Sequence, residues 1–359
     1  MKPELKQNRH QLKHFILLHS DLNCSKSYSL RSSNLVLKRT NLRVFKIAEL
    51  KAATNDFGIS SKIGEGEFWS VHKGTIKSFE HPYDDIQGHR KWLREATVLG
   101  VVEHPNLVRL IVYCVEDDET KTQRILVYDY MLNGSVDHRL SSSSEAPLSW
   151  TIRLKVAQDV ARGLAYLHEG MDYKIVFRDL KPSNILLDDQ WNAKLSDFGW
   201  LLRPQGLANV STTVTTGYTA PEYTETGYLT SECDVWSYGS FLYERITGSV
   251  PLAKNQPNEL HFLERVKAYL DSKRFRVIVD PRLEDNYSMK SAKKLLLIAD
   301  RCLSKNPKSR SKMSEVMEMV DKVIGGPSKA SILDTCLGSP VRVVSIKLKK
   351  VFRCTMKLQ

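Results

Sequence analysis

Four polar residues in the middle of the chain have the types and spacing that phosphoryl transfer requires. Asp179, Lys181 and Asn184 lie within one short segment, and Asp197 follows in the segment 196–199. Apolar runs surround both segments, as expected for short loops between buried elements. Phosphoryl transfer needs one carboxylate to orient the attacking hydroxyl and accept its proton. It also needs a carboxylate and an amide to hold Mg²⁺, and a lysine to neutralise charge on the phosphoryl group.

Residues 176–187 and 196–199 together resemble the catalytic loop and the magnesium-binding loop of protein kinases. The resemblance implies that Asp179 is the catalytic base and that Lys181 contacts the transferred phosphate. It also implies that Asn184 and Asp197 are the ligands of Mg²⁺. Four such positions in so short a stretch rarely coincide by chance, so a kinase site is favoured over a polar turn.

A glycine-containing segment at residues 63–71 resembles the loop that covers the phosphates of ATP in kinases. Glycine there allows backbone N–H groups to approach the phosphates closely. The usual third glycine of this loop is Trp69 in this chain. By the same resemblance, Tyr128 is the gatekeeper and the backbone after it binds the edge of adenine. The residues expected to contact ATP are Ile63, Gly64, Gly66, Val71, Asp129, Met131 and Leu186.

One element that the resemblance implies is missing from this region of the sequence. In kinases a strand containing Ala-x-Lys follows, and its lysine bridges the α- and β-phosphates to a glutamate on the next helix. Residues 74–88 contain no apolar Val-Ala-x-Lys strand, although the helix predicted at 89–100 carries the corresponding glutamate, Glu95. We therefore expect a small sheet with one strand missing and no lysine at the usual place. Three nearby lysines could substitute for it: Lys73, Lys77 and Lys91.

Other residues of the resemblance have expected structural roles. Asp234 should accept hydrogen bonds from the backbone of the catalytic loop, and Glu222 should form a buried ion pair with Arg310. Phe177 replaces the usual histidine of the catalytic loop and should pack against Phe198. The hydroxyl run at 211–216 resembles an activation segment, in which Arg178 could bind a phosphate.

Two further helices are predicted from the sequence. The first spans residues 47–54 and ends at Asn55, in a segment that resembles the region preceding the kinase domain of plant receptor-like kinases. The second spans residues 150–168, where apolar residues recur every three to four positions and define one buried face. Its apolar positions are Ile152, Val156, Val160, Leu164 and Leu167.

The charge of the chain is concentrated at its two ends. The 359 residues carry a formal net charge of +12. Residues 1–44 contribute +7 and residues 325–359 contribute +6, which leaves −1 for the residues between them. A nucleic-acid-binding core is therefore not expected. Residues 341–353 alternate Val, Ile and Leu with Lys and Arg, and could either lie on an anionic membrane or form a disordered tail.

The resemblance to protein kinases implies an α+β fold with two lobes. We expect a basic disordered tail at 1–44, a small β-rich lobe and hinge at 45–131, a large helical lobe at 132–324 and a basic tail at 325–359. Six scattered cysteines without a CxxC pair indicate reduced thiols in the cytoplasm.

The resemblance is closest to plant receptor-like cytoplasmic serine/threonine kinases. It implies ATP and Mg²⁺ as cofactors, protein substrates and a receptor kinase as partners, and a role in immune or growth signalling. Basic tails add peripheral contact with the plasma membrane, and no nucleic acid is expected as a partner. Because the usual lysine is absent, two alternatives stay open: a pseudokinase that acts as a binding scaffold, and an incomplete gene product with impaired use of ATP.

Overall fold

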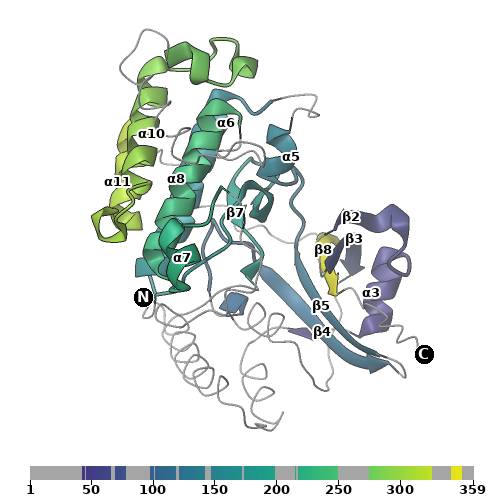
Figure 1. Ribbon diagram of the computed structural model, residues 1–359. Helices are drawn as coiled ribbons and strands as arrows, with labels where there is room; N and C mark the ends of the chain where they lie inside the picture. The colour runs from purple at the N-terminus through teal and green to yellow at the C-terminus, as the bar shows by residue number, and fades with distance from the viewer. Residues whose placement is uncertain are drawn as a thin grey trace, which may run out of the picture. The chain divides into compact units, whose positions relative to one another are not determined.

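A computed structural model describes most of the chain from residue 43 to residue 349 (Figure 1). It forms two compact units, Met1–Glu103 with Val108–Met131 and Leu333–Gln359, and His104–Leu107 with Leu132–Ile332. The residues described within them are 43–44, 46–65, 69–77, 98–100, 102–118, 121–141, 147–171, 174–198, 215, 217–249, 275–325 and 341–349.

The first unit is built on a six-stranded sheet. Its strands lie in the order β1-β4-β5-β8-β3-β2, and every neighbouring pair is antiparallel except β1 with β4. The strands are β1 (Arg43–Val44), β2 (Lys62–Glu65), β3 (Trp69–Lys77), β4 (Leu110–Asp118), β5 (Lys121–Asp129) and β8 (Val341–Lys349).

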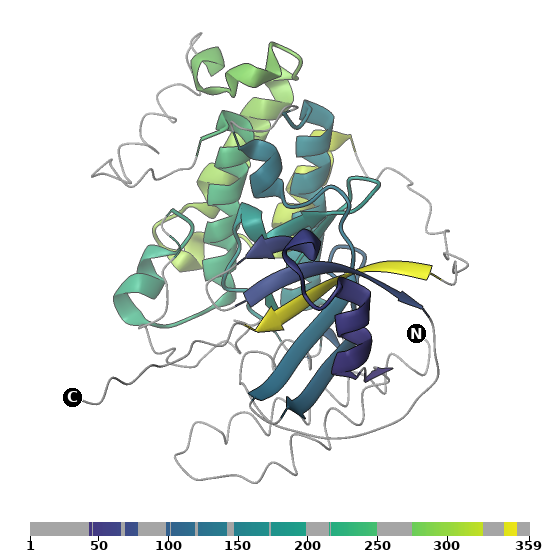
Figure 2. The same ribbon diagram turned by 90° about the vertical axis from the view of Figure 1, so that its right-hand side faces the viewer.

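Strand β8 comes from the C-terminal part of the chain, yet it lies inside this sheet (Figure 2, yellow). All nine residues of β8 pair with β3, from Val341 opposite Lys77 to Lys349 opposite Trp69. On its other side β8 pairs with residues 125–129 of β5. The expectation of a sheet with one strand missing is therefore not confirmed, because β8 fills the position beside β3. The expectation of a membrane-bound or disordered tail is wrong for residues 341–349, because both edges of that segment are paired within the sheet.

The alternation within β8 matches the two faces of the sheet. Residues directly opposite each other in an antiparallel pair share a face. Ile346 is opposite Val127, and Leu348 is opposite Ile125. Val127 and Ile125 are fully buried and pack with Leu50. Ile346 and Leu348 therefore lie on the face of the sheet that forms the core of this unit.

Helix α3 (Ile47–Thr54) covers that core, as the sequence predicts. The Glu49 carboxylate accepts a hydrogen bond of 2.9 Å from the backbone N–H of Lys46, which satisfies one of the unpaired donors at the start of the helix. The helix ends at Asn55, which has a left-handed backbone (φ 53°) that asparagine tolerates better than most residues. Leu50 is fully buried, and Phe57, just beyond the helix, packs against the same cluster.

The second unit is mainly helical. Its α-helices are α5 (Val136–Leu140), α6 (Trp150–Glu169), α7 (Pro221–Thr226), α8 (Ser231–Thr247), α10 (Met289–Cys302) and α11 (Met313–Ile324). A two-stranded sheet joins β6 (Ile185–Leu187) and β7 (Ala193–Leu195), and short 3₁₀ turns occur at Pro182–Asn184, Phe275–Ile278, Pro281–Leu283 and Pro307–Ser309. No helix among the described residues is long and apolar enough to cross a membrane.

The long helix α6 forms where the apolar periodicity predicts it. Four of its five predicted apolar positions are buried, whereas Ile152 is half-buried. The phenol of Tyr238 on α8 donates a 2.9 Å hydrogen bond to the carbonyl of Ala157 on α6. A buried ion pair of 2.6 Å between Arg153 and Asp280 attaches α6 to the segment after α8.

Placing a charge on the core face of β8 should destabilise the first unit. For Ile346→Asp we expect a loss of stability of about 3 kcal/mol or more, because the carboxylate would share a face with the buried Val127. Hydrogen exchange should show loss of protection in residues 341–349 and also in residues 125–129, which pair with them. Arg342→Ser, a change near the end of the same strand, is the control and should leave both segments protected. Rapid exchange of residues 341–349 in the unmodified protein would contradict this topology.

Candidate active site

Asp179 lies at the centre of a cluster of polar side chains in the second unit. Its carboxylate accepts hydrogen bonds from the Lys181 ammonium (2.7 Å), the Asn184 amide (3.0 Å) and the Thr215 hydroxyl (2.9 Å). The Asn184 amide also donates to the backbone carbonyl of Asp179 at 2.9 Å. The Asp179 side chain is 15% exposed. The structure therefore brings Asp179, Lys181 and Asn184 together as the sequence predicts, with a carboxylate that is oriented by three donors and still reachable from solvent.

Asp234, at the start of α8, holds the backbone that precedes Asp179. Its carboxylate accepts 2.7 Å hydrogen bonds from the backbone N–H groups of Phe177 and Arg178, and it contacts the His168 ring at 2.8 Å. The side chain of Asp234 is fully buried. Arg178 adopts a left-handed backbone (φ 73°), which is unfavourable for a residue with a long side chain. The predicted role of Asp234 is confirmed, and its two hydrogen bonds support a strained backbone next to Asp179.

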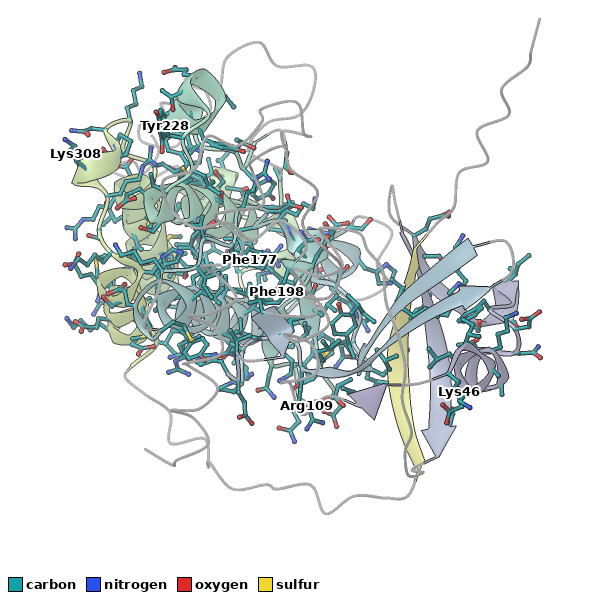
Figure 3. The ribbon with its side chains drawn as sticks, turned by 90° about the horizontal axis from the view of Figure 1, so that it is seen from below. Lys46, Arg109, Phe177, Phe198, Tyr228 and Lys308 are labelled. Atoms are coloured by element: carbon teal, nitrogen blue, oxygen red, sulfur yellow. The ribbon has the colours of Figure 1, made fainter. Side chains whose placement is uncertain are left out.

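Phe177 and Phe198 form an apolar contact next to the Asp179 cluster (Figure 3). Their rings meet edge to face, with centroids 5.4 Å apart, and both side chains are fully buried. Because Phe177 precedes Asp179 by two residues and Phe198 follows Asp197 directly, this contact connects the two loops. The predicted packing of Phe177 on Phe198 is confirmed.

The two predicted metal ligands lie on neighbouring segments. Asn184 ends a 3₁₀ turn, and its backbone carbonyl accepts hydrogen bonds from the N–H (2.9 Å) and hydroxyl (3.0 Å) of Ser196. Asp197 follows Ser196 with a left-handed backbone (φ 63°). The Asn184 nitrogen is used by Asp179, so its side-chain oxygen is the atom suited to a cation. One amide oxygen and one carboxylate form a donor set that suits Mg²⁺, which usually takes its other ligands from phosphates and water.

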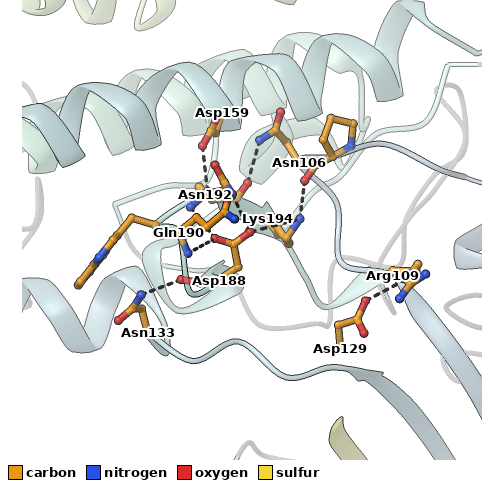
Figure 4. Close-up of polar contacts among 12 residues, drawn as sticks. Asn106, Arg109, Asp129, Asn133, Asp159, Asp188, Gln190, Asn192 and Lys194 are labelled. Atoms are coloured by element: carbon orange, nitrogen blue, oxygen red, sulfur yellow. Dashed lines mark hydrogen bonds and ion pairs between the residues drawn. The ribbon is translucent and has the colours of Figure 1, made fainter. Parts of the chain in front are cut away.

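A network of hydrogen bonds supports the β6–β7 hairpin between these two loops (Figure 4). The side-chain amide of Asn106 donates to the carbonyl of Ala193 at 3.0 Å, and Asp159 on α6 accepts from the N–H of the same residue at 2.9 Å. At the turn, the Asp188 carboxylate accepts from the backbone N–H of Asn192 at 2.8 Å. Leu186, predicted to contact adenine, is half-buried in the middle of β6.

The predicted ion pair between Glu222 and Arg310 is present in the second unit. The Arg310 guanidinium donates two hydrogen bonds to the carboxylate, of 2.5 and 2.9 Å. Arg310 is fully buried as a side chain and also donates to the backbone carbonyls of Ser304 and Glu232. The pair connects α7, which follows the activation segment, to the turn before α11.

The predicted nucleotide-binding residues of the first unit lie on two strand pairs. Gly64 on β2 is opposite Val71 on β3, and Ile63 is 47% exposed. Asp129 ends β5, where its carboxylate pairs with Arg109 at 2.9 Å (Figure 4). Met131, two residues later, is buried. Gly66 and Glu95 lie outside the described residues.

Thr215 is the contact of Asp179 that the sequence analysis did not identify. It belongs to the hydroxyl run at 211–216, which we interpreted as a set of candidate phosphorylation sites. In the structure its hydroxyl donates to the Asp179 carboxylate, so it positions the expected base. A hydroxyl within a run of Ser and Thr carries no sequence signal that separates the two roles.

Comparison with known proteins decides the family. A family model described as "Protein kinase domain" matches residues 37–320. The chain belongs to the protein kinase family.

Similar curated proteins place this kinase among the serine/threonine kinases. It is 53% identical to serine/threonine-protein kinase PCRK2 of Arabidopsis thaliana over 318 residues, covering 83% of this chain and 76% of the relative. It is 52% identical to serine/threonine-protein kinase PCRK1 of the same plant over 309 residues, covering 81% and 74%. A protein of Gossypium barbadense, the EPD1-interacting receptor-like cytoplasmic serine/threonine-protein kinase 5D, is 42% identical over 320 residues, covering 83% and 68%. The chain is accordingly a serine/threonine protein kinase with a two-lobed α+β fold.

His104 introduces a pH dependence into the second unit of the kinase. Its ring stacks on Tyr166 with centroids 4.8 Å apart, and its Nδ1 accepts a hydrogen bond from the N–H of Asn106 at 3.1 Å. Burial, together with the nearby positive charges of Lys194 and Arg162, lowers the pKa of His104 to about 4. The folded protein thus holds this ring neutral, as a hydrogen-bond acceptor.

We expect acid to destabilise the second unit through His104. Between pH 6.5 and about 4 the unfolded chain binds a proton at this ring and the folded chain does not, so stability falls as the pH falls. Allowing for partial exposure, the loss from pH 7 to pH 5 should be on the order of 1–2 kcal/mol. His104→Asn keeps an acceptor without a titrating group and should show a smaller loss in urea unfolding at the two pH values. Equal losses in both proteins would exclude this contribution.

Removing the charge of Asp234 should destabilise the kinase strongly. In Asp234→Asn an amide replaces a carboxylate that accepts from two backbone N–H groups, and we expect a cost of about 3–5 kcal/mol. Urea unfolding measures this cost. Glu225→Gln, on the exposed side of α7, removes the same type of charge and should change stability by less than about 0.5 kcal/mol. Similar values for the two variants would show that Asp234 is not required for the fold.

Proposed function

We propose that this kinase transfers the γ-phosphoryl group of ATP to serine or threonine hydroxyls of protein substrates, with Asp179 as the catalytic base. The observation that carries the proposal is the arrangement of Lys181, Asn184 and Thr215 around one half-buried carboxylate. Three donors keep the carboxylate in one orientation, and such preorganisation is the main catalytic contribution that a kinase makes.

In this mechanism the substrate hydroxyl approaches Asp179 and donates a hydrogen bond to its carboxylate. The hydroxyl oxygen forms a bond to the γ-phosphorus, and the bond to the oxygen bridging the β- and γ-phosphates breaks, releasing ADP. The hydroxyl proton passes to Asp179 and then to solvent. Lys181, 2.7 Å from Asp179, carries a positive charge that would offset the negative charge on the transferred group.

Asn184 and Asp197 are the residues that would hold Mg²⁺. When bound, the ion would supply positive charge that offsets the negative charge of the phosphates. The hydrogen bonds of Ser196 to the Asn184 carbonyl keep the segment carrying Asp197 next to the segment carrying Asn184. The residues proposed to bind the nucleotide are Ile63, Gly64, Gly66, Val71, Asp129, Met131 and Leu186. The proposed lobes span residues 45–131, whose sheet β8 completes, and residues 132–324.

A role in receptor-linked signalling in the plant cytoplasm is the biological setting that we propose. The name of the cotton relative describes a receptor-like cytoplasmic kinase, and two further relatives are serine/threonine kinases of Arabidopsis thaliana. A receptor kinase is then the expected upstream partner, in immune or growth signalling. Peripheral contact with the plasma membrane is assigned to the basic residues 1–44, since β8 belongs to the sheet.

A scaffold without transfer activity is the second candidate, and one feature of the sequence favours it. Residues 74–88 contain no Val-Ala-x-Lys sequence with the usual nucleotide-binding lysine, and Trp69 replaces the third glycine. A scaffold of this kind should fold and show a melting temperature that Mg·ATP does not change.

Autophosphorylation with labelled ATP and Mg²⁺ distinguishes the two functions. Asp179→Asn and Asp197→Asn should each lower the rate by about 10²-fold or more, because each removes a positioned charge. Asp189→Asn, an exposed change in the β6–β7 turn, is the matched control and should retain the rate of the unmodified kinase. Equal incorporation in Asp179→Asn and the unmodified chain would contradict the proposed mechanism, and no incorporation in a folded sample would favour the scaffold.

A further inference from the structure

The position of β8 in the sheet bears on the missing lysine. Consecutive strands usually pair with each other, so the strand that follows β3 in the chain is the one expected beside it. In this kinase β3 pairs with β8 instead, over all nine residues. The sheet therefore has a strand at the expected place, supplied from a distant part of the sequence.

The sequence of β8 has the pattern of a nucleotide-binding strand. Residues 344–347 read Val-Ser-Ile-Lys, which matches Val-Ala-x-Lys with serine in place of alanine. Serine and alanine both have small side chains, so Ser345 keeps a small residue at that position of the motif. Residues 78–88, between β3 and the predicted helix, show no such match.

The pairing register places Lys347 among residues predicted to bind ATP. Lys347 is directly opposite Val71 on β3, the residue expected to pack on adenine. On its other side Lys347 is opposite Leu126 on β5. Ser345, two residues before Lys347 on β8, is opposite Tyr128, the predicted gatekeeper. Opposite residues in antiparallel pairs share a face, and alternate residues of one strand share it too. Lys347 therefore lies on the same face of the sheet as Val71 and Tyr128.

Among the described residues, the competing lysines fit this position less well, and Lys91 lies outside those residues. The Lys73 ammonium is 4.7 Å from the centre of the Tyr130 ring, and its side chain is exposed. Lys77 pairs with Val341 at the far end of β3, three alternate positions from Val71. Lys349 lies on the same face as Lys347 but is opposite Trp69 at the end of the strand, and it does not match the motif.

We propose that Lys347 is the nucleotide-binding lysine of this kinase, contributed by a C-terminal strand that completes the sheet. The inference rests on the proposed function and deepens it. The Lys347 ammonium would pair with the α- and β-phosphate oxygens of ATP and hold them for transfer. The kinase thereby obtains a nucleotide-binding lysine, although this lysine follows the catalytic loop in the sequence.

Labelling of the full chain with an acyl-phosphate derivative of ATP tests this assignment directly. A lysine near the phosphates attacks the acyl carbon, the bond to the phosphate oxygen breaks, and ATP leaves with that electron pair while the amine loses its proton. We expect mass spectrometry to find the acyl group on Lys347 and on Lys181, with both labels suppressed by excess Mg·ATP. A suppressible label on Lys73 or Lys349 in place of Lys347 would overturn the inference.

Substitution provides the second test. Lys347→Met should lower kcat/KM for autophosphorylation by about 10²–10³-fold, the usual effect of losing one positioned charge in such a site. Lys349→Met and Lys73→Met remove one charge each from the same face and should stay within about threefold of the unmodified kinase. Equal rates for all three variants would exclude the role of Lys347. Melting temperatures report folding, and labelling of the unmodified chain decides the matter if Lys347→Met does not fold.

The two tests separate this inference from the proposed function. Label on Lys181 without label on Lys347, together with activity that depends on Asp179, would leave the kinase mechanism standing and remove Lys347 from it. Label on Lys347 without any transfer would support the nucleotide site and contradict catalysis. Absence of label on both lysines would contradict both.

Discussion

The hydrogen bonds between β8 and its two neighbours are the constraint on which the first unit depends. β3 and β5 both pair with β8, so β8 joins the β2–β3 hairpin to the three strands β5, β4 and β1. Without it each piece would expose an unpaired edge, and a hairpin or a small sheet alone is marginally stable in water. The apolar face of β8 also extends the core that α3 covers. One nine-residue strand thus completes both the hydrogen bonding and the hydrophobic core.

In the second unit, the main constraint is the strained backbone of the catalytic loop, which its neighbours must stabilise. Two residues of these loops have a left-handed backbone: Arg178, which precedes Asp179, and Asp197, which is itself a proposed metal ligand. The buried Asp234 carboxylate and the contact between Phe177 and Phe198 stabilise this conformation. These partners come from α8 and from the loops themselves, so all of them belong to the second unit.

The sequence predicts the second unit well because its signals are local or belong to a family pattern. Asp179, Lys181 and Asn184 form one short segment, and the partners Asp234 and Arg310 are found where the resemblance implies them. The position of β8 could not be predicted in the same way. Alternating apolar and basic residues fit a strand, a membrane surface or a solvated tail, and only the open position beside β3 decides among them. Thr215 was missed because a hydroxyl that positions a base looks the same as one that accepts phosphate.

The topology of the sheet also fixes when the first unit can fold during protein synthesis. Residues 78–340 separate β3 from β8, so the ribosome completes the whole second unit before β8 is made. Closing a loop of this length costs only about 5 kcal/mol of chain entropy, since the cost grows with the logarithm of loop length. The delay matters more than the free energy. Until β8 arrives, the edges of β3 and β5 are available to other strands, and nascent chains with such edges are prone to misassociation. We therefore expect nucleotide binding to mature only once β8 has been synthesised, with chaperones protecting the first unit in the interval.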